Sequence, residues 1–487
     1  MKYTTTSRPR GRVLDLRVEL DWDVRNQGSR VHSALRSAIL DGRLQAGMQL
    51  PSSRSLAEQL GVRRNAVVAA YEHLVGDGLL EARHGAGTYV SRYIQAPADP
   101  AAPDAPSLAL DFAPPRRRAF ALGHTFVEDD ILRRLGGYLR HHVLTAGVEE
   151  IGYGDPRGSA HLREQIAQHL AVHRGVRCDP ACIVVTSGTQ NALRLCIDAL
   201  LRPGDPVWME DPGYYATHVT MRATGLDLVP VPVDDEGLDV TAGIAANEKA
   251  RAAYVTPSHQ FPTGVTMSMR RRVALIEWAR ASKSWIFEDD YDSEYRFAGP
   301  PLTALAGIGA ECVIYIGTFT KILFAGLRLA YMVLPPEIVP RVLTARASLD
   351  RFPPRFMQDA VAGVLADGSL ARHTRRMRTR YREARDVVVT TLEEAAGGAL
   401  SFYGPAQGLH IAARLPEDVS TEMAVGLRER ADIDAKLLSE TQLTPGGPEG
   451  FIVGYSGHPL PELRAAARRL GQAAREVAGN ARSRARR

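Results

Sequence analysis

Residues 313–328 read Val-Ile-Tyr-Ile-Gly-Thr-Phe-Thr-Lys-Ile-Leu-Phe-Ala-Gly-Leu-Arg, an apolar run that leads into a lysine. The run is short and rich in β-branched and aromatic residues, which is typical of a buried strand in an α/β sheet. A lysine that leaves such a strand can form a Schiff base if its surroundings keep the amine neutral. The stretch therefore predicts a buried strand with a nucleophilic amine, Lys321, at its end.

The wider segment 312–334 is the most apolar part of the chain, but it does not read as a membrane span. It contains Lys321 and Arg328, and a charged side chain at bilayer depth is costly. We therefore interpret the segment as two buried strands around a functional loop.

Similar apolar runs alternate with helical patterns on both sides of this segment. The strand-like runs are 183–186, 207–210, 253–256, 285–288, 313–316 and 331–334, and the clearest helical patterns are 190–201 and 270–282. Such alternation predicts a mainly parallel sheet with helices on both faces. After about residue 340 the pattern becomes helical and then mixed. This predicts a large part over about 145–340 and a smaller C-terminal α+β subdomain over about 341–475.

Two polar segments could supply partners for the lysine. Thr-Ser-Gly-Thr-Gln-Asn-Ala at 186–192 follows a strand and opens a helix, an arrangement that can hold a phosphate, although serine and threonine are also ordinary helix caps. Glu-Asp-Asp-Tyr-Asp-Ser-Glu-Tyr at 288–295 ends another strand, where open α/β sheets place ligands, although most acid runs are solvated turns. A phosphate site, an acid for a ring nitrogen and an amine for an aldehyde together are what pyridoxal phosphate requires.

The first ninety residues predict a small helical module with a hairpin. Helical patterns cover 31–40, 56–60 and 64–75, and 79–90 reads as two strands around a glycine-containing turn. The third helix begins Arg63-Arg64-Asn65, so its basic and amide side chains lie at the N-terminal end, which enters the major groove in helix-turn-helix proteins. The alternative is that these arginines only solvate a small domain.

Composition divides the chain between residues 92 and 116. The stretch 95–106, Gln-Ala-Pro-Ala-Asp-Pro-Ala-Ala-Pro-Asp-Ala-Pro, predicts an extended linker, so the domains are 1–92, the linker 93–115 and 116–487. Residues 1–95 hold 14 Lys and Arg against 9 Asp and Glu, and the remainder holds 46 of each, so the net charge of +5 lies in the N-terminal module. Four cysteines without metal-ligand spacing, and no signal-like N-terminus, predict no metal site and a cytoplasmic setting.

The N-terminal module resembles the winged helix-turn-helix of GntR-type bacterial regulators. The matching segments, in family order, are Leu-Pro-Ser-Ser-Arg at 50–54, Leu-Ala-Glu-Gln-Leu-Gly-Val at 56–62 and Gly-Ala-Gly-Thr-Tyr-Val at 85–90. The resemblance implies that double-stranded DNA is the partner. The implied contacts to phosphates or base edges are Arg54, Arg63, Arg64 and Asn65, with Arg83 and His84 from the wing.

The rest of the chain, from about 111 to 457, resembles a fold type I aminotransferase. The motifs are Tyr-Gly-Asp-Pro-Arg-Gly at 153–158, Glu-Asp-Pro-Gly-Tyr at 210–214 and Thr-Pro-Ser-His-Gln-Phe-Pro-Thr-Gly at 256–264. The whole chain is identified as a member of the MocR-type, GabR-like regulators, in which such a domain follows a GntR-like reader. The resemblance implies a cytoplasmic bacterial protein that associates with the nucleoid through DNA. It also implies a homodimer with domain exchange on an operator of two half-sites.

The resemblance assigns cofactor roles by motif. Lys321 would carry pyridoxal 5'-phosphate through a Schiff base, Asp289 would pair with the pyridine nitrogen, Tyr291 would reach the ring hydroxyl and Tyr214 would stack on the ring. The residues implied at the phosphate are Ser187, Gly188, Thr189, Thr318 and Arg328, with Tyr153 contributed by the neighbouring subunit. The alternatives are a core aromatic for Tyr214 and a structural arginine for Arg328.

Two departures from the aminotransferase pattern bear on catalysis. The late arginine that clamps a substrate carboxylate is missing from Gly-Phe-Ile-Val-Gly-Tyr at 450–455, so the bidentate fork is absent there. Phe261 stands where an asparagine usually supports the ring oxygen, with His259 and Gln260 as candidate polar substitutes. We expect the cofactor to bind and transamination to be weak at most.

Three functions follow from these observations. The leading hypothesis is a transcriptional regulator that senses an amine, an amino acid or a B6 vitamer by displacement of Lys321 from the cofactor. The second is a working aminotransferase with an ancillary DNA-binding domain. The third is a DNA-binding protein whose cofactor is purely structural.

Overall fold

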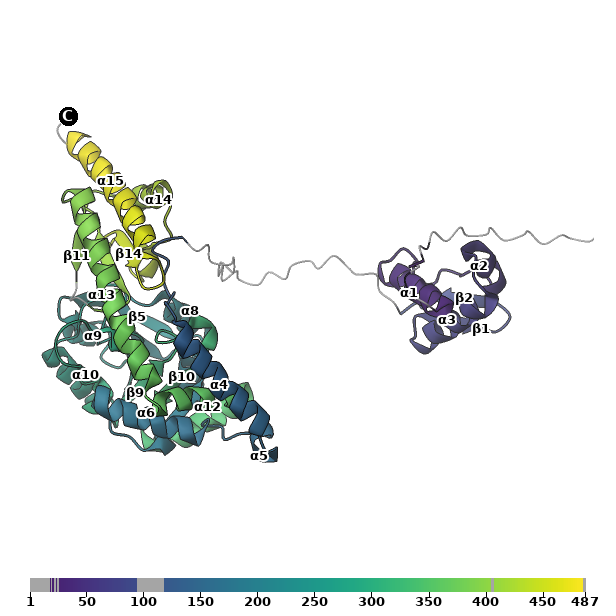
Figure 1. The fold of residues 1–487 in the computed structure, drawn as a ribbon, viewed down its shortest axis with the longest axis horizontal. Coiled ribbons are helices and arrows are strands. Elements are labelled where there is room, and N and C mark those ends of the chain that lie inside the picture. Colours follow the sequence, from purple (N-terminus) through teal and green to yellow (C-terminus); the bar gives the residue numbers. More distant parts are fainter. Residues whose placement is uncertain are drawn as a thin grey trace, which may run out of the picture. The chain divides into compact units, whose positions relative to one another are not determined.

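The computed structural model describes residues 26–93, 118–403 and 407–484, together with 18, 20, 21 and 23 (Figure 1). The chain divides into two compact units, Met1–Ala113 and Pro114–Arg487. The predicted linker, 93–115, lies outside the described residues except for Tyr93.

The first unit is a three-helix module with a two-stranded wing, as predicted. Its elements are α1 (Gln27–Leu40), α2 (Ser53–Leu60), α3 (Arg64–Gly76), β1 (Leu80–Arg83) and β2 (Gly87–Val90), and the two strands pair antiparallel. Ser52 caps α2 by accepting a hydrogen bond from the Ser55 N–H, and Gly61 ends that helix in the left-handed conformation. Leu35, Leu56 and Val67, from the three helices, are fully buried together.

The second unit is built on an eight-stranded sheet. Its strands are β3 (Ile183–Thr186), β4 (Pro206–Asp211), β5 (Asp227–Asp234), β6 (Gly237–Leu238), β7 (Ala252–Val255), β8 (Trp285–Asp290), β9 (Val313–Thr318) and β10 (Ala330–Val333). They follow the order β3-β10-β9-β8-β7-β4-β5-β6. The pairings from β9 through β8, β7 and β4 to β5 are parallel, as predicted, whereas β10 runs antiparallel to both of its neighbours.

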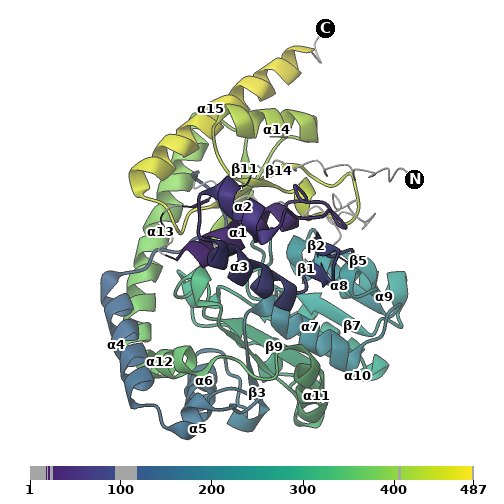
Figure 2. The ribbon, with the colours of Figure 1, turned by 90° about the vertical axis from the view of Figure 1, so that its right-hand side faces the viewer.

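Helices cover both faces of this sheet, because successive strand residues point to opposite sides. On β8, Ile286 packs into one core and Phe287 into the other. The first core takes most of its helical side chains from α4 (Asp129–Thr145), α6 (Ala160–His173), α10 (Met269–Ser282) and α12 (Arg355–Ala366), and the second takes them from α7 (Thr189–Leu200), α8 (Tyr215–Ala223) and α11 (Val339–Leu349). Figure 2 shows α4, α6 and α12 side by side. The remaining helices of this part are α5 (Val148–Ile151) and α9 (Val240–Asn247).

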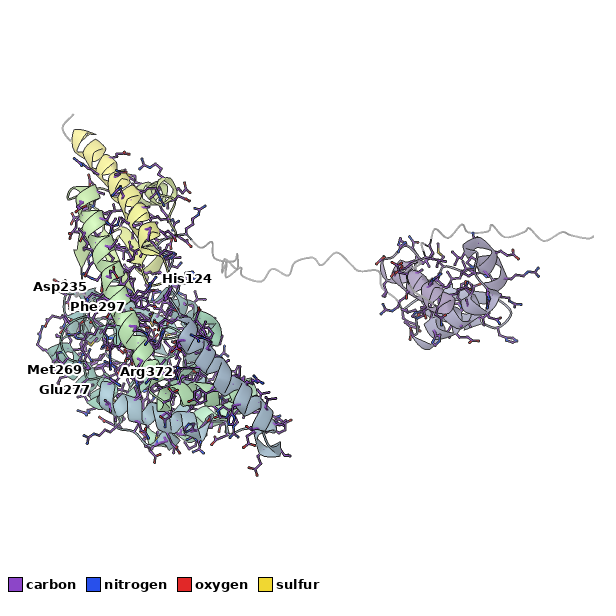
Figure 3. All side chains as sticks on the ribbon, in the orientation of Figure 1. His124, Asp235, Met269, Glu277, Phe297 and Arg372 are labelled. Carbon is purple, nitrogen blue, oxygen red and sulfur yellow. The ribbon has the colours of Figure 1, made fainter. Side chains whose placement is uncertain are left out.

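Helix α10 packs against the sheet with one side and is exposed on the other. Met269 and Glu277 lie at the outside of the molecule (Figure 3), whereas Leu275 and Trp278 are buried against the sheet. None of the described helices combines the length and the apolar character that a membrane crossing requires.

The C-terminal part is a smaller α+β layer, as predicted. Its elements are α13 (Ser369–Ala396), β11 (Ser401–Tyr403), β12 (His410–Arg414), α14 (Thr421–Arg430), β13 (Lys436–Leu437), β14 (Gly450–Gly454) and α15 (Leu460–Arg484). The sheet order is β11-β12-β14-β13, and α13 lies along α15 (Figure 1). Phe120, which precedes every helix of the second unit, is buried in this core and bridges to Gly454.

Candidate cofactor site and DNA-reading face

A cavity of about 440 Å³ opens at the carboxyl ends of β7, β8 and β9, which is the edge where parallel sheets place ligands. Eight of the predicted cofactor residues line it: Gly188, Thr189, Tyr214, Asp289, Tyr291, Thr318, Lys321 and Arg328. Its volume lies within the range of small-molecule sites. The other lining residues include Leu122, Gly123, His124, Phe261, Leu409 and His410.

The three acids that end β8 separate onto two faces of the sheet. Glu288 accepts hydrogen bonds from main-chain N–H groups away from the cavity, and Asp290 forms an ion pair of 2.7 Å with Arg174. Only Asp289, which lies between them and points the other way, lines the cavity. The alternation of a strand therefore selects one carboxylate from the acid run.

Asp289 has one satisfied and one unsatisfied oxygen. Its Oδ2 accepts a 2.5 Å hydrogen bond from the hydroxyl of Tyr254, whereas its Oδ1 is buried without a partner. Burial raises the pKa of Asp289 to about 7, against the hydrogen bond from Tyr254, which lowers it. A protonated pyridine nitrogen would supply both the missing donor and a compensating charge, so this position fits the ring of pyridoxal phosphate.

Lys321 follows β9 and is half-buried beside Gly123. Burial lowers the pKa of its amine, while the charges of Asp292 and Asp289 oppose that shift. Gly123 has a φ of 83°, and a Cβ at that position would lie 3.2 Å from Nζ. The glycine thus lets the main chain approach the amine closely. An amine with a lowered pKa is the form that condenses with an aldehyde.

Arg328 adds a guanidinium to the cavity lining, next to Gly188. Gly188, with a φ of 138°, precedes the first turn of α7, and a Cβ there would lie 3.0 Å from Nη2 of Arg328. Within the described part of the chain, no acidic residue forms an ion pair with Arg328. An unpaired guanidinium beside a helix N-terminus fits a phosphate. Thr189 and Thr318 line the same cavity.

An aromatic wall closes the side where a ring would lie. Tyr214 and Phe261 meet edge to face with ring centroids 5.4 Å apart, and Tyr291 packs in the same cluster. Tyr214 is thus both a cavity residue and a member of an aromatic cluster.

Four residues named from sequence lie outside the cavity. Ser187 does not line the cavity, and its main-chain N–H donates a hydrogen bond to the side-chain oxygen of Asn191. Tyr153 is 82% exposed, and its predicted role concerns a neighbouring subunit and stays a prediction. His259 and Gln260 are buried behind the wall, and Gln260 donates to Glu210 and to the carbonyl of Pro212.

Sequence reasoning missed the parts of the cavity that come from distant segments. Gly123 and His124 precede every helix of the second unit, and Leu409 and His410 come from the C-terminal part. None of them belongs to a motif, so only the tertiary fold identifies them.

The predicted DNA contacts lie at the surface of the first unit. Arg54 and Arg64 line one hollow between α2 and α3, and Arg63 and Asn65 flank Arg64 at the exposed start of α3. In the wing, His84 is exposed at the turn. Arg83 is held by Glu81, at 3.1 Å, and over the ring of Tyr89.

Comparisons with known proteins agree with both halves of this description. Residues 27–90 match the family of bacterial regulatory proteins of the gntR type, and residues 139–469 match the family of class I and II aminotransferases. The probable rhizopine catabolism regulatory protein MocR of Rhizobium meliloti is 33% identical over 442 residues, 88% of this chain and 89% of the relative. The chain belongs to the MocR-type family of regulators.

Other MocR-type proteins and solved aminotransferases extend the comparison. The pyridoxine biosynthesis transcriptional regulator PdxR of Corynebacterium glutamicum is 30% identical and covers 88% of this chain and 92% of its own. The kynurenine aminotransferase of Pyrococcus horikoshii superposes with a TM-score of 0.68 at 25% identity, over 74% of this chain and 91% of that structure. The chain is therefore a helix-turn-helix transcriptional regulator with an aminotransferase-like domain, and pyridoxal phosphate is the cofactor that this fold implies.

Proposed function

We propose that this MocR-type regulator controls transcription by sensing an amine, an amino acid or a B6 vitamer in the cavity around Lys321. The observation that carries the proposal is the joining of a surface DNA-reading face and a buried cofactor cavity in one chain. When bound, the cofactor supplies an aldehyde that exchanges amines. Lys321 and Asp289 would hold its reactive end and ring nitrogen, and Arg328 its phosphate.

Other site residues take supporting roles in this proposal. Tyr291 would reach the ring hydroxyl, and Tyr214 would stack on the ring. The remaining phosphate contacts would come from Ser187, Gly188, Thr189 and Thr318, and the partner copy would contribute Tyr153. On the DNA side, Arg54, Arg63, Arg64 and Asn65 would read the groove from α3 and its surroundings, with Arg83 and His84 from the wing.

A strap at residues 118–125 offers a route from the cavity toward the linker. Gly123 abuts the Lys321 amine, and Thr125 donates a 2.7 Å hydrogen bond to the carbonyl of Leu323. At its other end, Arg118 pairs with Asp432, and the Gly454 N–H donates to the Phe120 carbonyl, so the strap joins the large part to the small part. A ligand that moves Lys321 therefore acts on the first described residues after the predicted linker.

The helices α4 and α5 favour a homodimer. Leu144, Val148, Ile151 and Tyr153 are 71–89% exposed although all are large and apolar or aromatic. Such a patch is typical of an interaction surface. A second copy on this face would also bring Tyr153 to a cavity other than its own. We propose a dimer with domain exchange that reads two half-sites, in the cytoplasm and on the nucleoid.

The cavity wall disfavours efficient transamination of α-amino acids. Ile452, in the stretch where aminotransferases carry the clamping arginine, is fully buried in an apolar cluster with Phe261, Ala412 and Leu438. Ile452 is not among the residues that line the cavity, and its side chain offers an α-carboxylate no guanidinium fork. The aminotransferase with an ancillary reader is the second candidate, and the cavity itself is the observation that favours it.

DNA binding tests the proposal. Fluorescence anisotropy with the chain's own promoter region, with and without pyridoxal phosphate, should show an affinity change of about fivefold or more, the usual scale of allosteric coupling. Lys321→Ala should remove the response while leaving affinity without cofactor intact. Equal affinities in all four measurements would contradict sensing, and sustained turnover of an amino donor with a keto acid would favour the enzyme.

A further inference from the structure

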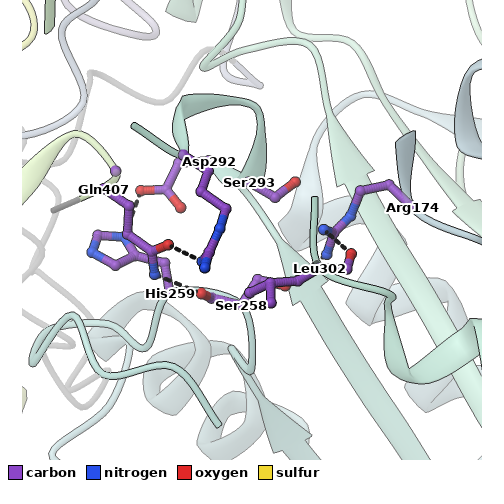
Figure 4. Close-up of a pocket in the computed structure, with 9 residues that line it drawn as sticks. Arg174, Ser258, His259, Asp292, Ser293, Leu302 and Gln407 are labelled. Atoms are coloured by element: carbon purple, nitrogen blue, oxygen red, sulfur yellow. Dashed lines mark hydrogen bonds and ion pairs between the residues drawn. The ribbon is translucent and has the colours of Figure 1, made fainter. Parts of the chain in front are cut away.

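His259 and Asp292 form a buried pair next to Tyr291, and neither of the two lines the cavity. His259, in the loop after β7, and Asp292, after β8, are 4% and 3% exposed, and His259 Nδ1 lies 2.7 Å from Asp292 Oδ2. Figure 4 shows the two side chains facing one another beside Gln407. A carboxylate this deeply buried needs a compensating partner, and the imidazole supplies it.

The pair holds the hydroxyl of Tyr291. That hydroxyl donates a 3.0 Å hydrogen bond to the main-chain carbonyl of His259 and lies 3.2 Å from its Nδ1. The Tyr291 ring lines the cavity. Asp292 therefore orients His259, and His259 in turn sets where the hydroxyl of Tyr291 lies.

Asp292 also acts on Lys321 through its charge. Of the acids that oppose the lowered pKa of Lys321, Asp292 has the larger effect and Asp289 the smaller. Burial raises the pKa of Asp292, and His259 lowers it. Other charged or titratable groups also face Asp292. They are Asp289, Asp290, Tyr291 and Tyr295 on the same segment, His410 on β12, Tyr455 after β14, and Arg174 and Arg296 near the pair.

The pair also lies against the small part of the domain. Gly408 has a φ of 78°, and a Cβ there would overlap the His259 ring and approach Asp292 Oδ2 to 2.7 Å. The adjacent Gln407 donates a 2.8 Å hydrogen bond to the carbonyl of Ser258. The loop before β12 thus closes over the pair without space for a side chain.

A metal ion is the competing explanation, because His410 brings a third ligand atom within 4.8 Å. Two ligands at about 2.0 Å from a tetrahedral zinc lie about 3.3 Å apart. The 2.7 Å between His259 and Asp292 is shorter than that and matches a charge-assisted hydrogen bond. His410 has its own acceptor, the Pro262 carbonyl at 3.2 Å from Nε2.

We propose that Asp292 and His259 are positioning residues that hold the Tyr291 hydroxyl at the edge of the cavity where the cofactor ring would bind. The inference rests on the proposed function, because it requires pyridoxal phosphate in the cavity. It assigns the pair a role in tuning the bound cofactor and none in holding it.

The test is a pH titration of the visible absorption of the full chain saturated with pyridoxal phosphate. Asp292→Asn, which keeps the shape and removes the charge, should still take up the cofactor and should lower the midpoint by about one pH unit. His259→Ala should also move the midpoint, and His259→Asn, which keeps a nitrogen near the Nδ1 position, should restore most of the wild-type value. The double variant Asp292→Asn with His259→Ala should shift less than the sum of the singles.

Asp235→Asn is the matched control, because it removes an equal charge from an exposed turn of the same domain. Circular dichroism checks folding. If Asp292→Asn does not fold, the same titration is made on Gly408→Ala, because its methyl group displaces the pair.

Cofactor uptake with an unchanged midpoint in the folded variants would overturn the inference and leave the proposed function intact. Stoichiometric zinc, found by elemental analysis of the purified protein, would also overturn it. Failure of the wild-type chain to take up the cofactor would overturn both.

Discussion

Arg54 of the DNA-reading unit and Arg174 of the cofactor unit differ in what surrounds them. Arg54 is 81% exposed, and among the described residues its one ion-pair partner is Glu58, itself 73% exposed, at 3.4 Å. In the cofactor unit, Arg174 is 5% exposed and pairs with Asp290, which is 1% exposed, at 2.7 Å. The first kind of pair is weak and easily exchanged for another anion, whereas the second is fixed by the fold.

The two environments suit two different functions, DNA binding at a surface and ligand binding in a cavity. A surface arginine can replace its hydrating water with a DNA phosphate at little cost in free energy. The resulting affinity for DNA depends on the salt concentration. At the cofactor cavity, two groups lack protein partners among the described residues: the exposed guanidinium of Arg328 forms no ion pair, and the buried Oδ1 of Asp289 accepts no hydrogen bond. These two groups mark where a ligand would complete the structure. Substitutions in the two units should therefore fail in different ways.

The largest expected effect is on cofactor binding by Arg328→Ala. The variant removes the unpaired guanidinium beside Gly188, and we expect affinity for pyridoxal phosphate to fall by about a hundredfold, the upper scale of a lost charge-assisted hydrogen bond. Equilibrium dialysis measures the change. Arg341→Ala, an arginine on α11 that donates to the Ala199 carbonyl, is the control and should leave cofactor affinity unchanged.

Next in size is the loss of DNA affinity in Arg64→Ala. Arg64 starts α3 at the surface, and loss of a base or phosphate contact should cost about 1–3 kcal/mol, roughly fivefold to a hundredfold in Kd. Anisotropy at several salt concentrations separates a base contact, which relaxes sequence preference, from a phosphate contact, which reduces the salt slope. Cofactor affinity should stay as in the wild type, and a parallel loss would contradict the separation of the units.

A smaller effect concerns the pH dependence of the cofactor-free protein. The folded-state pKa values of Asp289 and Glu210, both about 7, lie above their usual 3.8 and 4.5, so the folded state binds these protons more tightly. Their contribution to stability is present at acidic pH and is lost as pH rises through about 7. Thermal melts should shift down by several degrees between pH 5 and pH 8. Asp289→Asn should flatten that decline, and an unchanged decline would show that other groups cause it.

The smallest effect expected is that of Glu58→Gln. The variant frees Arg54 from an exposed pair, so folding stability should change by less than about 0.5 kcal/mol and DNA affinity should rise by less than about threefold. Chemical denaturation and anisotropy measure the two quantities. A stability loss of more than about 1 kcal/mol would show that surface pairs in this unit are structural.

Local patterns in the sequence predicted much of the fold, and the family resemblance named eight of the residues that line the cavity. Strand β3 matches the predicted run 183–186, and α3 differs from its prediction by one residue. In both elements the pattern of apolar residues along the sequence indicates where the element begins and ends. The acid run at 288–295 did not by itself separate Asp289 from Asp290. Strand alternation and the partner Arg174 do so in the structure.

What local patterns could not predict depends on distant segments. The antiparallel direction of β10 follows from the turn after Lys321 and not from its composition, which resembles that of its parallel neighbours. Gly123 reaches Lys321 from a segment almost two hundred residues earlier, and Gly408 meets His259 across the two parts of the domain. Such contacts leave no periodic signal in one sequence.

The central claim, that the state of the Lys321 cavity controls DNA occupancy, is tested most directly by following both in one sample. Candidate amines are titrated into the protein saturated with pyridoxal phosphate on labelled promoter DNA, and visible absorption and anisotropy are recorded together. The account predicts that at least one amine changes both signals with a common midpoint, and that Lys321→Ala shows neither change. An amine that changes the absorption fully while anisotropy stays constant would contradict it.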